Sequence, residues 1–115
     1  MAYNPELADR IRAAIIAEPD YADLLSEKKM FGGLAFLIAG TMAVTASSAG
    51  GMMLRVDPAT EAHLVNGRDI VPMEMRGRPM AGWLHLAPEA LESDADLGHY
   101  VRLGLAYAKG MPPGR

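Results

Sequence analysis

Hydrophobic residues recur with helical spacing at both ends of the chain. Near the start, one face of a predicted helix collects the apolar residues Leu7, Ala8, Ile11, Ala14 and Ile15. Asn4 before Pro5 is typical of a helix start, because the Asn side chain accepts a hydrogen bond from a free backbone N–H and proline presets φ. Pro19 predicts that this helix ends near Ala17 or Glu18.

A second long helix is predicted over 94–109. Ser93 followed by Asp96 resembles a capping box, and Gly110 ends the pattern. The apolar residues of this helix are Leu97, Tyr100, Val101, Leu103, Leu105, Tyr107 and Ala108. They span roughly 200°, about twice the stripe that a surface helix needs. We expect Leu97, Val101, Leu105 and Ala108 to face a sheet, and the flank of Tyr100, Leu103 and Tyr107 to need a further cover.

Between these helices the apolar period changes to two, which predicts strands. The predicted strands are 34–39, 41–46, 52–56, 70–76 and 82–86, with a short helix over 58–65 and a helical turn over 20–26. Gly40-Thr41 favours a tight hairpin, and Pro72 restricts its strand to a sheet edge or to the start of the strand. Adjacent Gly32 and Gly33 predict a positive φ or a bulge where the first strand begins.

These elements predict a single α+β domain over 1–115, built on an antiparallel sheet, with an ordered core of about 4–110. The stretch 30–54 carries no charge and is long enough to span a bilayer. Its glycines, threonines and serines interrupt it, and its strongly apolar part, 34–38, is followed by a turn signal. A buried β-hairpin is therefore favoured over a membrane helix.

Composition narrows the classes of function. The net charge is −3, and the basic residues do not cluster, which argues against a general nucleic-acid coat. The absence of Cys excludes a disulfide scaffold, a thiolate zinc site and a cysteine nucleophile, and it is compatible with a reducing cytosol. At the N-terminus no apolar stretch follows a basic start, so we expect no signal peptide.

No catalytic constellation stands out. The three histidines, His63, His85 and His99, have no ligand-like spacing to each other or to carboxylates, so we expect no metal and no cofactor. The acidic residues around 89–96 precede or open a helix, where negative charge is favourable in any case. Nine methionines are many for 115 residues; methionine fills irregular cores and also lines adaptable protein-binding surfaces.

Three stretches resemble the N-terminal domain of the TfoX/Sxy family, named after bacterial regulators of natural competence. They are Met-Phe-Gly-Gly-Leu-Ala-Phe at 30–36, Met-Leu-Arg-Val at 53–56 and Gly-Arg-Pro-Met-Ala-Gly-Trp at 77–83. The signature positions are Met30, Phe31, Gly32, Gly33, Arg55, Gly77, Arg78, Pro79, Gly82 and Trp83. The resemblance covers essentially the whole chain. It implies a helix, three antiparallel strands, a helix, two strands and a helix, similar to the secretion-chaperone-like architecture.

The resemblance also implies that the protein acts in the cytoplasm and is not an enzyme. Competence regulators of the family carry a second, helical domain and are thought to act with a transcription factor at promoters. The resemblance here is confined to the first domain, so the fold and a role as an interaction module are what carry over. A stand-alone domain is expected.

Arg78 and Trp83 allow two interpretations. In the first, Arg78 ties its turn to the sheet or to Glu74, and Trp83 caps the core. In the second, Arg55, Arg78 and Trp83 surround a pocket for a small ligand or substrate, because a guanidinium can clamp a carboxylate or stack on an indole. A pocket of at least ~300 Å³ with convergent polar groups would favour the second.

The leading hypothesis is a small, non-enzymatic protein-interaction domain with a possible regulatory role. We expect a homodimer that covers the flank of Tyr100, Leu103 and Tyr107, since a dimer buries the same patch on both chains. In the competing account, the segment 20–25 or the first helix covers this flank within one chain. A pocket protein or enzyme and a DNA-associated regulator are the alternatives, and the acidic balance weakens direct nucleic-acid binding.

Overall fold

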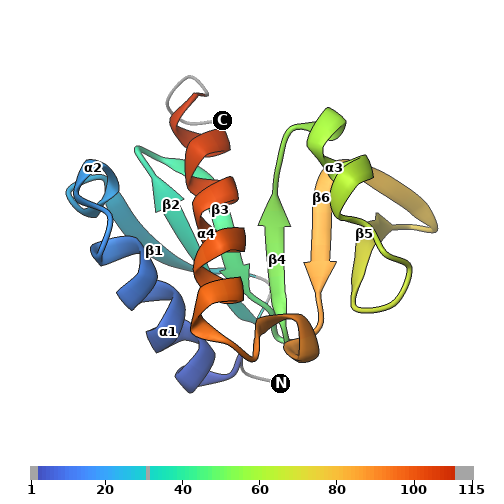
Figure 1. Cartoon of the computed structure of the whole chain (residues 1–115), viewed down its shortest axis with the longest axis horizontal. Coiled ribbons are helices and arrows are strands. Elements are labelled where there is room, and N and C mark those ends of the chain that lie inside the picture. The colour runs from blue at the N-terminus through green and yellow to red at the C-terminus, as the bar shows by residue number, and fades with distance from the viewer. Residues whose placement is uncertain (1–2, 31, 111–115) are drawn as a thin grey trace.

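An antiparallel sheet with its main helices on one face makes up the chain (Figure 1). The computed structural model describes residues 3–30 and 32–110. The described elements are α1 (Pro5–Ile16), α2 (Pro19–Ala22), β1 (Leu25–Met30), β2 (Gly33–Ile38), β3 (Thr41–Ala46), β4 (Met52–Arg55), α3 (Pro58–Leu64), β5 (Ile70–Met75), β6 (Arg78–Leu86), a 3-10 turn η1 (Pro88–Leu91) and α4 (Asp94–Lys109). The predicted α+β class is confirmed.

The sheet order is β1-β2-β3-β4-β6-β5, and every described neighbouring pair is antiparallel. The β2–β3 hairpin turns through Ala39 and Gly40, and the β5–β6 hairpin turns through Arg76 and Gly77. All four residues have positive φ, as two-residue hairpin turns require. The strand that contains Pro72 lies at the sheet edge, as predicted.

Both long helices begin and end as the sequence predicts. The Asn4 side chain accepts a hydrogen bond from the backbone N–H of Glu6 at 2.9 Å, and Ser93 Oγ accepts one from Asp96 at 3.0 Å. Helix α4 ends at Lys109, one residue before Gly110. These ends are correct because caps and prolines act locally, within one helical turn.

The sheet has one strand more than the sequence analysis predicted. Residues 20–26 were expected to form a helical turn; instead α2 ends at Ala22 and β1 begins at Leu25. Strand β1 is an edge strand that pairs with β2, and its central Ser26, Glu27 and Lys28 are exposed. It therefore has no alternating apolar pattern to detect. Strand β6 also begins four residues earlier than predicted, at Arg78.

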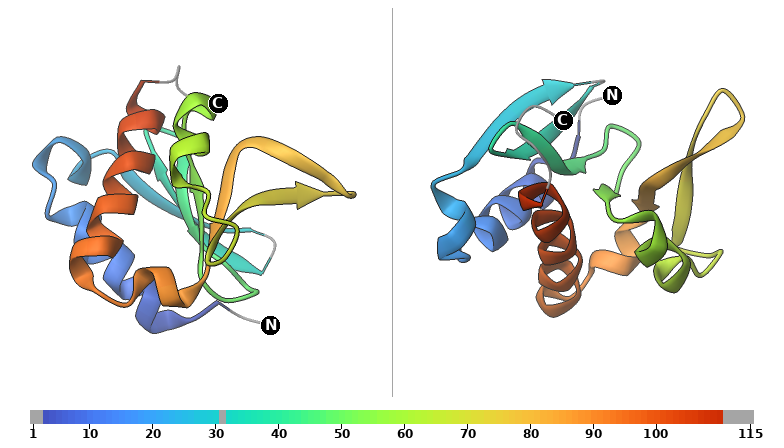
Figure 2. Two further views of the ribbon diagram at one scale, coloured as in Figure 1. Left: turned by 45° about the vertical axis from the view of Figure 1, so that its right-hand side comes forward. Right: turned by 90° about the horizontal axis from the view of Figure 1, so that it is seen from above.

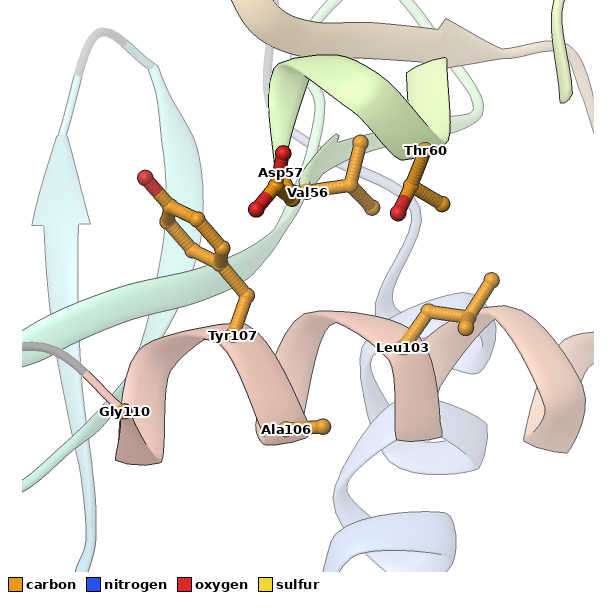
Figure 3. A pocket seen from close by; sticks show the side chains of 7 residues that line it. All are labelled: Val56, Asp57, Thr60, Leu103, Ala106, Tyr107 and Gly110. Atoms are coloured by element: carbon orange, nitrogen blue, oxygen red, sulfur yellow. The ribbon is translucent and has the colours of Figure 1, made fainter. Parts of the chain in front are cut away.

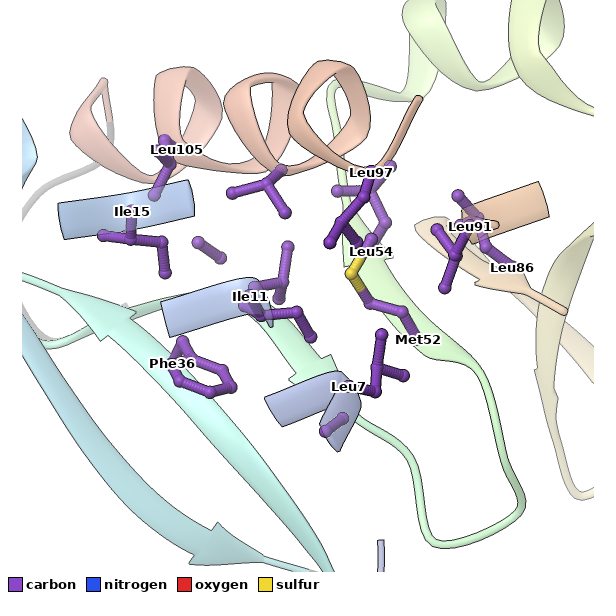
Figure 4. Close-up of a cluster of buried hydrophobic side chains, with 14 of the residues drawn as sticks. Leu7, Ile11, Ile15, Phe36, Met52, Leu54, Leu86, Leu91, Leu97 and Leu105 are labelled. Carbon is purple, nitrogen blue, oxygen red and sulfur yellow. The ribbon is translucent and has the colours of Figure 1, made fainter. Parts of the chain in front are cut away.

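The core lies between the sheet and the pair α1 and α4, which cross the same face side by side (Figures 1 and 2). The predicted stripe of Leu97, Val101, Leu105 and Ala108 is buried there. Figure 4 shows Ile11 and Ile15 of α1 pointing toward Phe36 on β2, with Leu105 above them.

The start of β2 confirms the prediction about its two glycines. Gly32 has a φ of 77°, which a residue with a side chain rarely adopts. A Cβ on Gly33 would lie 2.5 Å from the carbonyl oxygen of Ala46, so β2 and β3 approach too closely there for any other residue. The neighbouring signature residue Phe31 lies outside the described residues.

The uncharged stretch 30–54 forms strands β2 and β3 and leads into β4, which confirms the hairpin interpretation. Within the described ranges, no helix has both the length and the apolar content needed to cross a membrane.

Candidate functional site

The face of the sheet opposite α1 and α4, here called the outer face, is covered by none of the described helices (Figure 2). Because successive strand residues point to opposite faces, the neighbours of the core residues define it. Cross-strand pairing joins one row across all six strands: Lys28, Ala35, Thr45, Met53, His85 and Val71. Four of these side chains are apolar or small, one is a cation, and none is acidic.

Methionine contributes to this face. The hydroxyl of Thr45 donates a hydrogen bond to the sulfur of Met42 at 3.2 Å, which brings Met42 onto the same face despite the irregular register of β2 and β3. Met42 and Met53 are half-buried. His85 Nε2 lies 2.8 Å from the carbonyl oxygen of Gly50 and ties the loop before β4 to this face.

Arg55 is the basic side chain of the outer face on β4. It pairs across strands with Trp83, and its guanidinium carbon lies 5.2 Å from the centre of the Trp83 ring. The same carbon lies 5.3 Å from the ring centre of Tyr107 on α4. The guanidinium therefore lies over two aromatic rings, one from the sheet and one from the helical layer. Both contacts are favourable cation–π interactions.

The N–H donors of Arg55 have no hydrogen-bond or ion-pair partner in the part of the chain that the structure describes. Two arginines of α1 are different: Arg10 binds Asp94, and Arg12 binds Glu27 and Asp9. Arg55 is half-buried, so its donors lie at the surface of the molecule without a fixed acceptor.

The sequence placed Arg78 beside Arg55 and Trp83, and the structure does not. Arg78 is exposed and pairs with Met75 beside the turn of the β5–β6 hairpin. Five residues of β6, including the irregular stretch at Gly82, separate it from Trp83 along the chain. Among the described residues, the Arg78 side chain makes no ion pair with Glu74 either, so neither predicted role is found.

The rest of the signature 77–83 joins β6 to its neighbours. The backbone N–H of Gly82 donates to the Glu61 carboxylate of α3 at 2.8 Å, and the Gly82 carbonyl accepts from Val56 at 2.8 Å. Pro79 pairs with Glu74, and Gly77 lies in the hairpin turn. These signature residues thus position α3 and the end of β4, while Trp83 lies half-buried on the outer face.

A cleft of about 440 Å³ opens between α3 and α4 (Figure 3). Its lining residues are Val56, Asp57, Thr60, Leu103, Ala106, Tyr107 and Gly110. Asp57 already accepts a hydrogen bond from Ala59 as the N-cap of α3. Tyr107 connects the cleft to the outer face, because its ring also contacts Arg55. Sequence reasoning missed this cleft, since no local pattern records how two helices far apart in the chain lie relative to each other.

The flank of Tyr100, Leu103 and Tyr107 is half-buried within one chain. Leu103 and Tyr107 line the cleft opposite α3, whereas Tyr100 contacts the His99 ring with 5.3 Å between ring centres. Burial raises the pKa of Tyr100, and the negative charges of Asp96 and Asp69 raise it further. Neither segment 20–25 nor α1 is among the residues that face Leu103 and Tyr107 across this cleft.

The histidines lie on three separate elements: His63 on α3, His85 on β6 and His99 on α4. Within residues 3–30 and 32–110, no group of three or more His, Asp or Glu side chains is placed to hold a metal ion.

Comparison with known proteins places this fold in a family. The model of the TfoX N-terminal domain matches residues 20–108. The matched range runs from α2 nearly to the end of α4 and contains the whole sheet, the Arg55 cluster and the cleft. A comparison with curated proteins gave no match. Since the matched range covers most of the chain and agrees with the signature stretches, this protein belongs to the TfoX N-terminal domain family.

Proposed function

We propose that this chain is a small, cytosolic, non-enzymatic interaction domain that docks a protein partner on the outer face of its sheet. The observation that carries the proposal is the row from Lys28 to Val71, which crosses all six strands, contains no acidic side chain and is covered by none of the described helices. Flexible methionines beside this row suit an adaptable docking surface. Family membership supports a regulatory context, because the family includes the competence regulators.

A pull-down from the native cytosol tests the proposal when it compares matched variants of the whole chain. Met53→Asp places a charge in the middle of the outer face. Ile16→Asp places the same charge on α1, where Ile16 is 56% exposed on the other side of the molecule. Circular dichroism checks that both variants fold.

We expect proteins that are retained by the wild type and by Ile16→Asp and are lost with Met53→Asp. Burying an unpaired carboxylate in an interface costs several kcal/mol, about 3–5, so retention should fall to background. Equal retention by all three chains would contradict docking on this face.

Small-ligand binding is the second candidate function, and the α3–α4 cleft favours it. Its volume of about 440 Å³ lies within the range of ligand sites, although it is lined by other residues than the predicted Arg55, Arg78 and Trp83. A cytosolic metabolite fraction that raises the Tm of the wild type but not of the cleft-filling variant Thr60→Phe would support this function. An identical Tm response in both chains would oppose it.

A further inference from the structure

Arg55 combines two features that fit an incoming anion. Its guanidinium lies over the rings of Trp83 and Tyr107, at 5.2 and 5.3 Å from their centres. Aromatic rings attract the cation through their faces and leave the N–H donors at the guanidinium edge unused. No described residue accepts a hydrogen bond from those donors, so the side chain is held in place while its strongest recognition groups stay free.

The charged side chains that the strand pairs place on the outer face also favour an anionic partner. Two acidic residues lie within the described strands, Glu27 and Glu74. Glu27 pairs with Phe36 of the core face and binds Arg12 of α1, so it does not face the outer side. Glu74 is exposed and pairs with Pro79 beyond a register shift, four residues along β6 from the Trp83 that pairs with Arg55. The charged side chains of the pairs that define the outer face are Lys28 and Arg55, both basic, in a chain whose net charge is −3.

From this geometry we infer that the partner of the outer face is an acidic peptide segment, whose Asp or Glu carboxylate binds the edge of Arg55. This inference rests on the proposed function. A planar carboxylate matches the two parallel donors of a guanidinium. Met53 lies two residues before Arg55 on the same face, about 7 Å away, and takes an apolar side chain of the same segment.

A nucleic acid fits these observations less well. Nucleic-acid surfaces neutralise several phosphates with a basic stripe, whereas the pairs that define the outer face hold two separated cations among methionine, valine and alanine. An acidic segment with apolar residues matches both the charge and the apolar area.

Selection from a phage-displayed library of random 12-residue peptides on the immobilised whole chain tests the inference. The selected peptides are expected to carry Asp or Glu next to Leu, Met or Phe. Replacing that acid by Asn or Gln should weaken binding about 10- to 100-fold, as expected for loss of a charge-assisted, bidentate hydrogen bond. Trp83 is the only tryptophan, so its fluorescence reports binding directly beside Arg55.

Arg55→Gln should produce the same loss, and combining it with the neutral peptide should add little, because both changes remove one contact. Arg78→Gln is the matched control, since it removes an exposed arginine of the neighbouring strand β6 that has no ion-pair partner among the described residues, and it should bind like the wild type. If Arg55→Gln does not fold, binding of the substituted peptide to the wild-type chain shows by itself whether the interaction requires the acidic side chain.

The outcomes separate the two proposals. Peptides that lose binding with Met53→Asp but do not depend on their own acid or on Arg55 would overturn the acidic partner and leave the docking face intact. Absence of any Met53-dependent peptide would overturn both. A 12-nucleotide single-stranded DNA that binds more tightly than the peptides and requires Arg55 would also overturn the inference, in favour of a nucleic acid.

Discussion

Gly104 lies where α4 packs closely against β3 and β4. A Cβ at this position would lie 2.7 Å from the carbonyl oxygen of Ala43, 2.9 Å from Leu54 Cδ1 and 3.0 Å from Val44 Cγ1. Two of these neighbours are buried side chains and the third is backbone, so none can move at low cost. Close packing of the helix on the sheet therefore requires glycine here.

We expect Gly104→Ala to lower the free energy of unfolding by about 1–3 kcal/mol, because overpacking outweighs the better helix propensity of alanine. Urea denaturation measures the change. Gly98→Ala in the same helix is the control, since its Cβ would meet the flexible end of Arg102 at 3.2 Å. The control should be neutral or stabilising by up to ~1 kcal/mol. Equal shifts for both variants would show that packing at Gly104 is loose.

Several other single positions were predictable because their constraints are local. The caps Asn4 and Ser93 and the glycine pair before β2 act through backbone geometry within a few residues. Arg78 lies outside the cluster that the sequence predicted, because its position is not set by a local constraint. Its place depends on where β6 begins, and the strand continues to the hairpin turn instead of starting at Gly82.

At the scale of elements, a bidentate ion pair connects α1 to the edge strand β1. Arg12 Nε lies 2.6 Å from Glu27 Oε2, and Arg12 Nη2 lies 2.8 Å from Glu27 Oε1. The hydrogen bonds from Arg12 lower the pKa of Glu27 below its ordinary value of 4.5, against the opposing effect of desolvation. The guanidinium carbon also lies 5.8 Å from the centre of the Phe36 ring, so the pair borders the core.

This pair makes stability depend on pH in the acidic range. The unfolded chain has the higher Glu27 pKa, so the stabilisation is fully present above about pH 4.5 and is lost as the pH falls through the lower folded value. We expect Glu27→Gln to cost about 0.5–1 kcal/mol at pH 7, because both side chains are about one-third exposed, and to cost almost nothing at pH 2.

Urea denaturation at the two pH values measures this difference. Glu74→Gln on the other edge strand is the matched control, because Glu74 is exposed and has no ion pair among the described residues. A Glu27→Gln cost that stays constant from pH 7 to pH 2 would mean that the carboxylate charge does not contribute.

The missed strand β1 belongs to this scale too. Its four central residues, Ser26 to Lys29, are exposed, so neither burial nor alternation marks them as a strand. What makes them extended is hydrogen bonding to β2, from Leu25 opposite Ile38 to Met30 opposite Gly33. Which strand pairs with β1 depends on the tertiary structure, so a local sequence pattern does not reveal it.

For the whole molecule, the homodimer expected from the sequence stays a prediction. Its expected surface is the flank of Tyr100, Leu103 and Tyr107, which is half-buried. We expect sedimentation at micromolar concentration to give twice the 12.3 kDa chain mass, and Leu103→Asp to give the single-chain mass. The physical reason is that a carboxylate at Leu103 would be buried without a partner in a two-fold interface.

Ile16→Asp, with the same charge on exposed α1 surface, should leave the sedimentation of the wild type unchanged. A wild-type chain that sediments at the single-chain mass would remove the dimer. The cleft wall formed by Leu103 and Tyr107 would then be ordinary half-buried surface facing α3.

The features that could be predicted from the sequence are the α+β class, the ends of both long helices, the central strands, the edge position of Pro72 and the family. These features depend on periodicity, caps, turns and signature residues that lie close together along the chain. Three features became visible in the folded chain alone: Arg55 contacts Trp83 and Tyr107 while Arg78 lies apart, α3 and α4 enclose a cleft, and none of the described helices covers one face of the sheet. Each of these depends on strand order, register and helix placement, which arise from contacts between residues far apart in the chain.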